Sequence, residues 1–179
     1  MNRVAAAIPH WQELDRTTLG ATADPINVTF TAKPYLMVLC HALPTTTRLA
    51  PQIQANSDTG NNYAARYSVN GGTDVIQTSH DTLRFGAGTD VDWEFIVGDF
   101  VNIAGQEKLK ISHCIFGENG AGTAPGRMET VSKWANTSNQ INEFDVKNTD
   151  TGDYGEFAAG SEVVVLGYDP ADTSGSNRS

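Results

Sequence analysis

Apolar and polar residues alternate with a period of two along most of this chain, which is typical of β-strands with one buried face. In residues 26–31, Ile26, Val28 and Phe30 fall on one face, and the residues between them are polar. Residues 35–43 form a short and almost continuously apolar segment, which predicts a strand buried on both faces. Further strands are predicted at 49–55, 63–69, 74–79, 91–97, 106–116, 128–134, 141–146 and 161–168.

Turn-forming residues separate these segments. Asn70-Gly71 is the strongest hairpin signal, because both residues tolerate positive φ, and the glycine-rich residues 117–127 form the longest loop candidate. About nine short strands joined mostly by short turns, with no convincing long helix, predict an all-β fold. We expect an antiparallel β-sandwich, jelly-roll-like in topology, with an N-terminal arm at 1–20, the sandwich domain at 21–168 and a polar C-terminal tail at 169–179.

Composition narrows the possible partners. A chain of 179 residues is long enough for one domain with a real core. Its net charge of −9 argues against holding nucleic acid, whose phosphates it would repel. No run approaches the roughly 18 apolar residues of a membrane span, so we expect no membrane partner. No basic segment followed by an apolar one is visible as a secretory signal. Two cysteines are too few for a disulfide scaffold.

The segment 91–97 has one apolar and one acidic face. Val91, Trp93, Phe95 and Val97 share the first, and we expect Trp93 in the core. Asp92 and Glu94 share the second, about 7 Å apart along a strand, near the separation of the two carboxyl groups in inverting glycosidases. A pair of carboxylates on a solvated strand face is the simpler interpretation.

Two Cys-His pairs, Cys40-His41 and His113-Cys114, lie on predicted buried strands. Neighbours in a strand point to opposite faces, so each pair offers one ligand per face, and two strands offer two where a structural zinc needs four. We therefore expect buried thiols and imidazoles in place of a metal site. A Cys40–Cys114 disulfide is geometrically possible if the two strands are neighbours.

Other motifs carry little chemistry. In 106–116, Leu109, Ile111, His113 and Ile115 alternate with Lys108, Lys110, Ser112 and Cys114. The loop 117–127 lacks the lysine and helix of a phosphate-binding loop. The turn containing Asp150, Asp153 and Glu156 has oxygen ligands without the regular spacing of a calcium loop. We expect no catalytic, cofactor-binding or metal residue.

Three apolar residues are the candidates for contact with a partner. Trp11 and Leu14 lie on the predicted arm, and tryptophan is enriched at interface hot spots, although Trp11 could also pack on its own domain. Trp134 precedes a turn, where it could be core or a platform for stacking a sugar.

Several segments resemble a family of small structural proteins that recur in tailed bacteriophages, especially marine ones, and in viral metagenomes. These segments are 11–20, 35–43, 56–74, 102–113, 120–141 and 161–170, and the most specific pieces within them are KWANTSNQI (133–141) and DTGNNYAARYS (58–68). It implies a virion component and carries no catalytic or metal residue.

Three functions follow as hypotheses. The first is a phage virion structural protein, most concretely a capsid decoration or cement protein. It would be assembled in the host cytoplasm, sit on the outer capsid surface or tail, and bind the major capsid protein or other virion proteins. We expect a homo-oligomer, either a trimer or a dimer. The second is a receptor- or carbohydrate-binding module of a head fibre or tail. The third, a hydrolase, would have to use Asp92 and Glu94.

Overall fold

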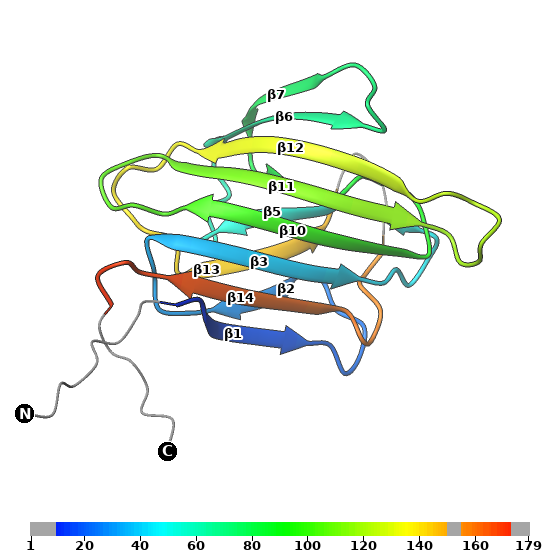
Figure 1. Cartoon of the computed structure of the whole chain (residues 1–179), viewed down its shortest axis with the longest axis horizontal. Helices are drawn as coiled ribbons and strands as arrows, with labels where there is room; N and C mark the ends of the chain where they lie inside the picture. The colour runs from blue at the N-terminus through cyan, green and yellow to red at the C-terminus, as the bar shows by residue number, and fades with distance from the viewer. Residues whose placement is uncertain (1–9, 150–154, 173–179) are drawn as a thin grey trace, which may run out of the picture.

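The computed structural model describes residues 10–149 and 155–172, and all of its regular elements are β-strands. Figure 1 shows a large sheet whose strands lie side by side in front of a smaller one. Every strand pair is antiparallel. The predicted all-β antiparallel sandwich is confirmed, while its jelly-roll topology stays a prediction.

The large sheet has eight strands, and its order brings the first and last strands of the chain together at one side. In spatial order they are β1 (Gln12–Thr18), β14 (Glu162–Tyr168), β3 (Tyr35–Ala42), β10 (Trp93–Val101), β11 (Lys108–Gly117), β12 (Gly126–Trp134), β6 (Tyr63–Val69) and β7 (Val75–His80).

The small sheet has four strands and packs behind the middle of the large one (Figure 1). In spatial order they are β2 (Ile26–Thr29), β13 (Glu143–Asn148), β5 (Pro51–Ala55) and β8 (Leu83–Arg84). Two further short strands, β4 (Arg48–Leu49) and β9 (Thr89–Asp90), pair with each other.

The apolar core lies between the two sheets. Val38 and Ile96 of the large sheet and Ile53, Phe144 and Val146 of the small sheet are all fully buried in one cluster. The strands that form it contribute alternate residues, as the pleat of a strand requires. The burial of β2 alternates strictly, with Ile26 and Val28 inside, as the period of two predicts.

The N-terminal segment 1–20, expected to be an arm or a leading strand, contains the first strand of the large sheet. Its residues 12–18 form β1, which pairs along β14 from Gln12↔Gly167 to Thr18↔Glu162. They join the sheet because their backbone groups complete its edge. Of the predicted tail, residues 169–172 are described, and Lys33 makes an ion pair with Asp172 at 3.0 Å. Residues 1–9 and 173–179 lie outside the described residues.

The hairpin between β6 and β7 turns at Asn70-Gly71, as predicted. Both residues have positive φ, 52° and 73°, and the amide of Gly72 donates to the carbonyl of Val69 at 2.9 Å. Two consecutive positive φ angles match the right-handed twist of the paired strands.

Replacing Gly71 by alanine should therefore lower the free energy of unfolding by about 1 kcal/mol, because an added Cβ is strained in the left-handed region. No steric clash adds to this, since the nearest atom to that Cβ would be Arg127 Nη2 at 3.6 Å. Gly122→Ala is the matched control: its Cβ would meet nothing within 4 Å, and its φ is not positive. Equal stability of the two variants in urea denaturation would contradict the turn geometry.

Candidate functional site

The most unusual feature of the molecule is the face of the eight-stranded sheet that points away from the small sheet, which we call the outer face. On β11 the polar residues Lys108, Lys110 and Ser112 are buried, while Leu109 and Ile111 are exposed. Alternation in a strand allows only one of these two sets to face the core. β11 therefore turns its polar set inward and its apolar set toward solvent.

The neighbouring strand β10 has the same inversion, which corrects two expectations. Trp93 and Phe95 lie on the outer face, where Trp93 is half-buried and Phe95 is exposed, so Trp93 is no core residue. Glu94, expected on a solvated face, is 0% exposed. Asp92 is exposed and accepts a hydrogen bond from the amide of Asn119 at 2.8 Å, so only one carboxylate of the predicted pair is solvated.

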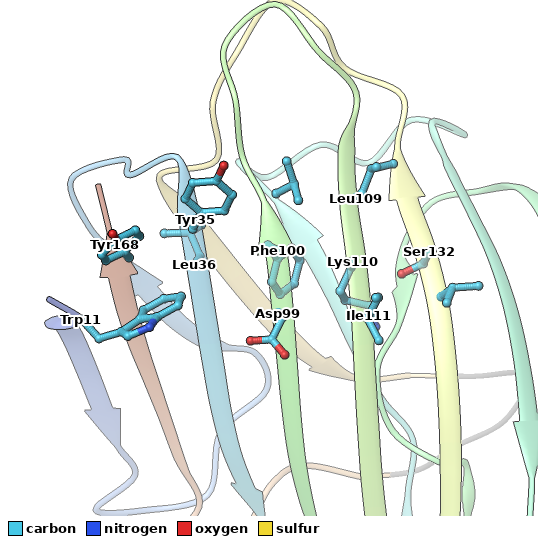
Figure 2. Close-up of a pocket in the computed structure, with 12 residues that line it drawn as sticks. Trp11, Tyr35, Leu36, Asp99, Phe100, Leu109, Lys110, Ile111, Ser132 and Tyr168 are labelled. Atoms are coloured by element: carbon cyan, nitrogen blue, oxygen red, sulfur yellow. The ribbon is translucent and has the colours of Figure 1, made fainter. Parts of the chain in front are cut away.

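Exposed apolar side chains cover the outer face from β10 to β12. A groove of about 610 Å³ runs across it, and Figure 2 shows its lining residues rising from several strands, with Trp11 and Tyr168 at one side and Leu109 and Ile111 at the other. Contiguous exposed apolar surface of this kind marks interaction sites. The large exposed apolar residues of this face are Trp11, Ile76, Phe95, Leu109, Ile111, Ile115 and Val131.

The three residues predicted to contact a partner have different surroundings. Trp11 is 42% exposed and lines the groove, with its ring centre 5.7 Å from that of Tyr168. Its contact with a partner stays a prediction. Leu14 is half-buried and packs against the core cluster.

Trp134 is a core residue, which corrects the sugar-platform interpretation. It is 1% exposed, its ring stacks on Tyr63, and its Nε1 donates to Asp58 Oδ2 at 2.7 Å. It is buried because it belongs to the inward-facing set of β12, together with Met128, Thr130 and Ser132. Its ring therefore offers no platform to a sugar.

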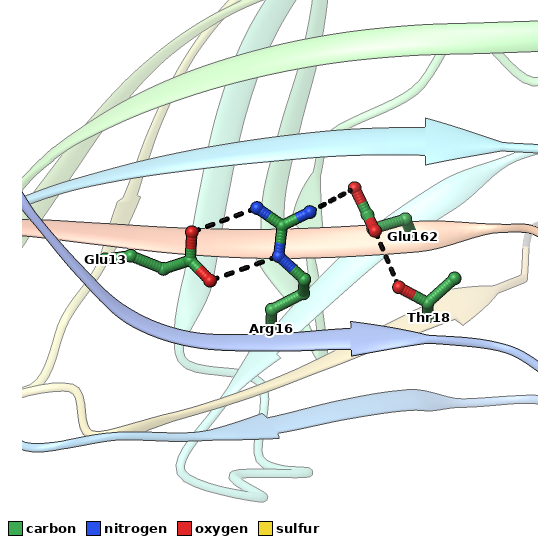
Figure 3. A network of polar contacts seen from close by, with 4 residues as sticks. All are labelled: Glu13, Arg16, Thr18 and Glu162. Atoms are coloured by element: carbon green, nitrogen blue, oxygen red, sulfur yellow. Dashed lines mark hydrogen bonds and ion pairs between the residues drawn. The ribbon is translucent and has the colours of Figure 1, made fainter.

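A polar network bounds the outer face at its β1 edge (Figure 3). Arg16 bridges Glu13 at 2.9 Å and Glu162 at 3.1 Å, and Thr18 Oγ1 donates to Glu162 Oε2 at 2.6 Å. The hydrogen bond from Arg16 lowers the pKa of Glu13, and that from Thr18 lowers the pKa of Glu162. These groups are solvent-exposed, so they mark the limit of the apolar surface and contribute little stability.

Behind the outer face, the polar side chains of β11 find partners inside the sandwich. Lys110 Nζ donates to the carbonyl of Arg84 and, at 2.8 Å, to Ser112 Oγ, and it lies 5.1 Å from the ring centre of Phe85. Gly98 makes room for that ring, because a Cβ at position 98 would come within 2.9 Å of it. The buried ammonium group is thus hydrogen-bonded, as a buried polar group must be.

Glu94 is the second ionisable group of this buried layer. Its Oε2 accepts from the amide of Ala87 at 3.3 Å and from Cys114 Sγ at 3.6 Å, and its Oε1 has no hydrogen-bond partner among the described residues. Burial raises the pKa of Glu94 to about 8 and lowers the pKa of Lys110 to about 7. Near neutral pH Glu94 is therefore largely protonated, and about half of Lys110 is uncharged.

The Cys-His pairs divide between the two faces. Cys40 and Cys114 are buried and free, and both lie opposite Ile96 on its two neighbouring strands. Two strand spacings, about 9 to 10 Å, separate them, which is too far for a disulfide. His41 and His113 are exposed on the outer face, so the expectation of buried imidazoles was wrong.

No other predicted motif forms a chemical site among the residues that the structure describes. Residues 118–125 form an exposed connection between β11 and β12. Asp150 and Asp153 of the possible calcium loop lie outside the described residues. Elsewhere in the described chain, no three His, Cys, Asp or Glu side chains converge as metal ligands would, and no helix is long and apolar enough to cross a membrane.

Comparison with known proteins found no match to this chain, either among protein-family models or among curated proteins.

The inversion of β10 and β11 predicts different costs for two isoleucines on adjacent strands. Ile96 is 0% exposed and Ile111 is 56% exposed. Ile96→Ala should lower the free energy of unfolding by about 2 to 5 kcal/mol, because it leaves a cavity, and Ile111→Ala by less than about 1 kcal/mol. Urea denaturation of dilute protein measures both. A larger loss for Ile111→Ala than for Ile96→Ala would show that the faces are assigned the wrong way round.

The raised pKa of Glu94 predicts that the free energy of unfolding depends on pH. Its folded-state pKa of about 8 lies above the ordinary value of 4.5, so its contribution is full below pH 4.5 and is lost as pH rises through 8. Glu94→Gln mimics the protonated acid and should gain stability relative to the natural chain by up to about 1.4 kcal/mol per pH unit across this window. Urea denaturation at several pH values measures this, with Glu118→Gln in the exposed loop as the control. A difference that stays constant from pH 5 to pH 8 would contradict a buried Glu94.

Proposed function

We propose that this chain is a structural protein of a phage virion, and most concretely a decoration or cement protein on the outer surface of the capsid. The observation that carries the proposal is the outer face. Leu109, Ile111 and Val131 are about half exposed there, on a broad sheet whose outer face no other described strand covers. An isolated monomer rarely keeps such a surface, whereas a subunit of a protein assembly covers it with a partner.

The distribution of ionisable groups supports a structural role over a catalytic one. Glu94, Lys110 and Arg84 are buried, each at most 3% exposed. The groove of the outer face is lined mostly by apolar residues, and Asp99 and the buried Lys110 are its carboxylate and its amine. Asp99 makes no hydrogen bond or ion pair to any described residue. Acid–base catalysis needs a positioned group whose pKa suits its task.

The charge of the chain supports a position on the outside of a particle. A net charge of −9 is repelled by packaged DNA and is compatible with a solvent-facing shell surface. The resemblance of residues 58–68 and 133–141 to phage structural proteins supports the same proposal. On a repeated lattice, modest contacts of each copy add up through multivalency.

The carbohydrate-binding alternative has lost its expected stacking residue, because Trp134 is buried. The exposed connection at 118–125 contains no aromatic side chain that could replace it. A structural role in the tail uses the same surface and is distinguished by location on the particle.

Particles of a phage that encodes this chain should therefore contain it in many symmetry-related copies on the outside of the shell. Quantitative mass spectrometry of purified particles measures its copy number against the major capsid protein, and cryo-electron microscopy locates it. Absence from the particles would overturn the proposal of a virion protein. Density at the tail alone would overturn decoration of the capsid.

A further inference from the structure

The outer face carries a row of residues whose pattern is complementary to itself. The register across the strands places six side chains in line, one from each of six neighbouring strands. In spatial order these strands are β3, β10, β11, β12, β6 and β7. Read across the sheet, three residues run apolar, acidic, apolar, and the next three run apolar, basic, apolar. In order they are Met37, Asp99, Ile111, Val131, Arg66 and Ile76.

From this row we propose that two copies of the chain pack outer face to outer face around a two-fold axis parallel to the strands, between β11 and β12. Such an axis places β11 over β12, β10 over β6 and β3 over β7 of the second copy. Ile111 then meets Val131, and Asp99 meets Arg66, twice by symmetry. A two-fold interface requires such self-complementarity, because the same patch faces itself. This proposal deepens the proposed function by naming the occupant of the outer face.

The two charged residues are available for this pairing. Asp99 is exposed and has no hydrogen bond or ion pair to any described residue. Arg66 contacts Asp74 through Nη1 alone, at 3.1 Å, with both side chains about half exposed. A guanidinium group has five N–H donors, so Arg66 can keep Asp74 and bind Asp99 of the second copy.

The surface has hollows on both sides of the proposed axis. Ile111 and Val131 line the groove that contains Asp99, and they also line a second hollow of about 280 Å³ that contains Arg66. The two apolar residues therefore stand between the groove that contains Asp99 and the hollow in which Arg66 lies with Asp74 and Glu129. In the next row, the same axis places His113 opposite Glu129 of the second copy.

Area and charge are both compatible with a dimer. Six strands spaced about 4.8 Å, each with four outward residues about 6.7 Å apart, present roughly 800 Å². A standard interface buries about that much on each partner. The face carries both signs of charge, although the chain as a whole carries −9. Its strands present the acidic residues Glu13, Asp99, Glu129 and Glu162 and the basic residues Arg16, Arg66, Arg127 and Lys133. Asp74 and Glu107 are ion-paired to Arg66 and Lys133.

A charge swap tests the pairing. Sedimentation equilibrium should show a dimer for the natural chain at high micromolar concentration. Asp99→Arg and Arg66→Asp should each weaken dimerisation about tenfold or more, because each variant opposes two like charges. The double variant D99R/R66D should regain most of the affinity. Glu118→Arg makes the same change in net charge as Asp99→Arg on an exposed loop, and it should leave dimerisation unchanged.

Each other result overturns the proposal. A chain that stays monomeric at high concentration has no such interface, and a trimer has no two-fold axis. A dimer that Ile111→Glu dissociates, but that the double swap does not restore, uses the outer face in another register. Circular dichroism confirms that every variant is folded. A failure of the proposed function can be distinguished from a failure of the dimer. The chain can be absent from phage particles while the double variant D99R/R66D still restores the dimer.

Discussion

One geometric constraint governs this structure: side chains alternate along a strand, so a strand that turns one set of residues inward must turn the other outward. On β11 the inward set contains Lys108, Lys110 and Ser112, and Leu109 and Ile111 are exposed as a direct consequence. The register carries this choice to the adjacent strands, where Val101 on β10 pairs with Leu109 and Val131 on β12 pairs with Ile111. The apolar surface is therefore a property of the whole sheet.

The inward lysines are tolerated because the sandwich supplies them with partners. Lys110 reaches the backbone of β8 and Ser112, and Phe85 packs against it in the space left by Gly98. Replacing a buried polar layer with apolar residues is often neutral or stabilising, so such a layer is no guarantee of stability. Its consequence here lies on the other side of the sheet, where the apolar residues of β11 remain available to a partner.

The strands and the Asn70-Gly71 turn could be predicted from the sequence, because alternation and turn chemistry are local. The sequence did not predict which face of the sheet is buried, because Trp93 and Phe95 form an apolar set that fits a core equally well. The best available signal was on β12, where Glu129 and Lys133 flank Val131 and mark that set as outward. Joining this signal to β11 needs the register Ile111↔Val131, which is a property of the folded sheet. The apolar surface of the outer face was not predicted either, because it depends on the same assignment of faces. Of its exposed residues, only Trp11 was expected to contact a partner.

Hydroxyl-radical footprinting at low and high protein concentration tests the central claim, that the apolar outer face is exposed in the single chain and covered on assembly. We expect Leu109, Ile111 and Val131 to react strongly in the dilute protein and to become protected in the concentrated one. Ile96 and Phe144 should stay unreactive at both concentrations, because both are fully buried in the core. Protection of Leu109, Ile111 and Val131 in the dilute chain, or equal reactivity at both concentrations, would contradict the account.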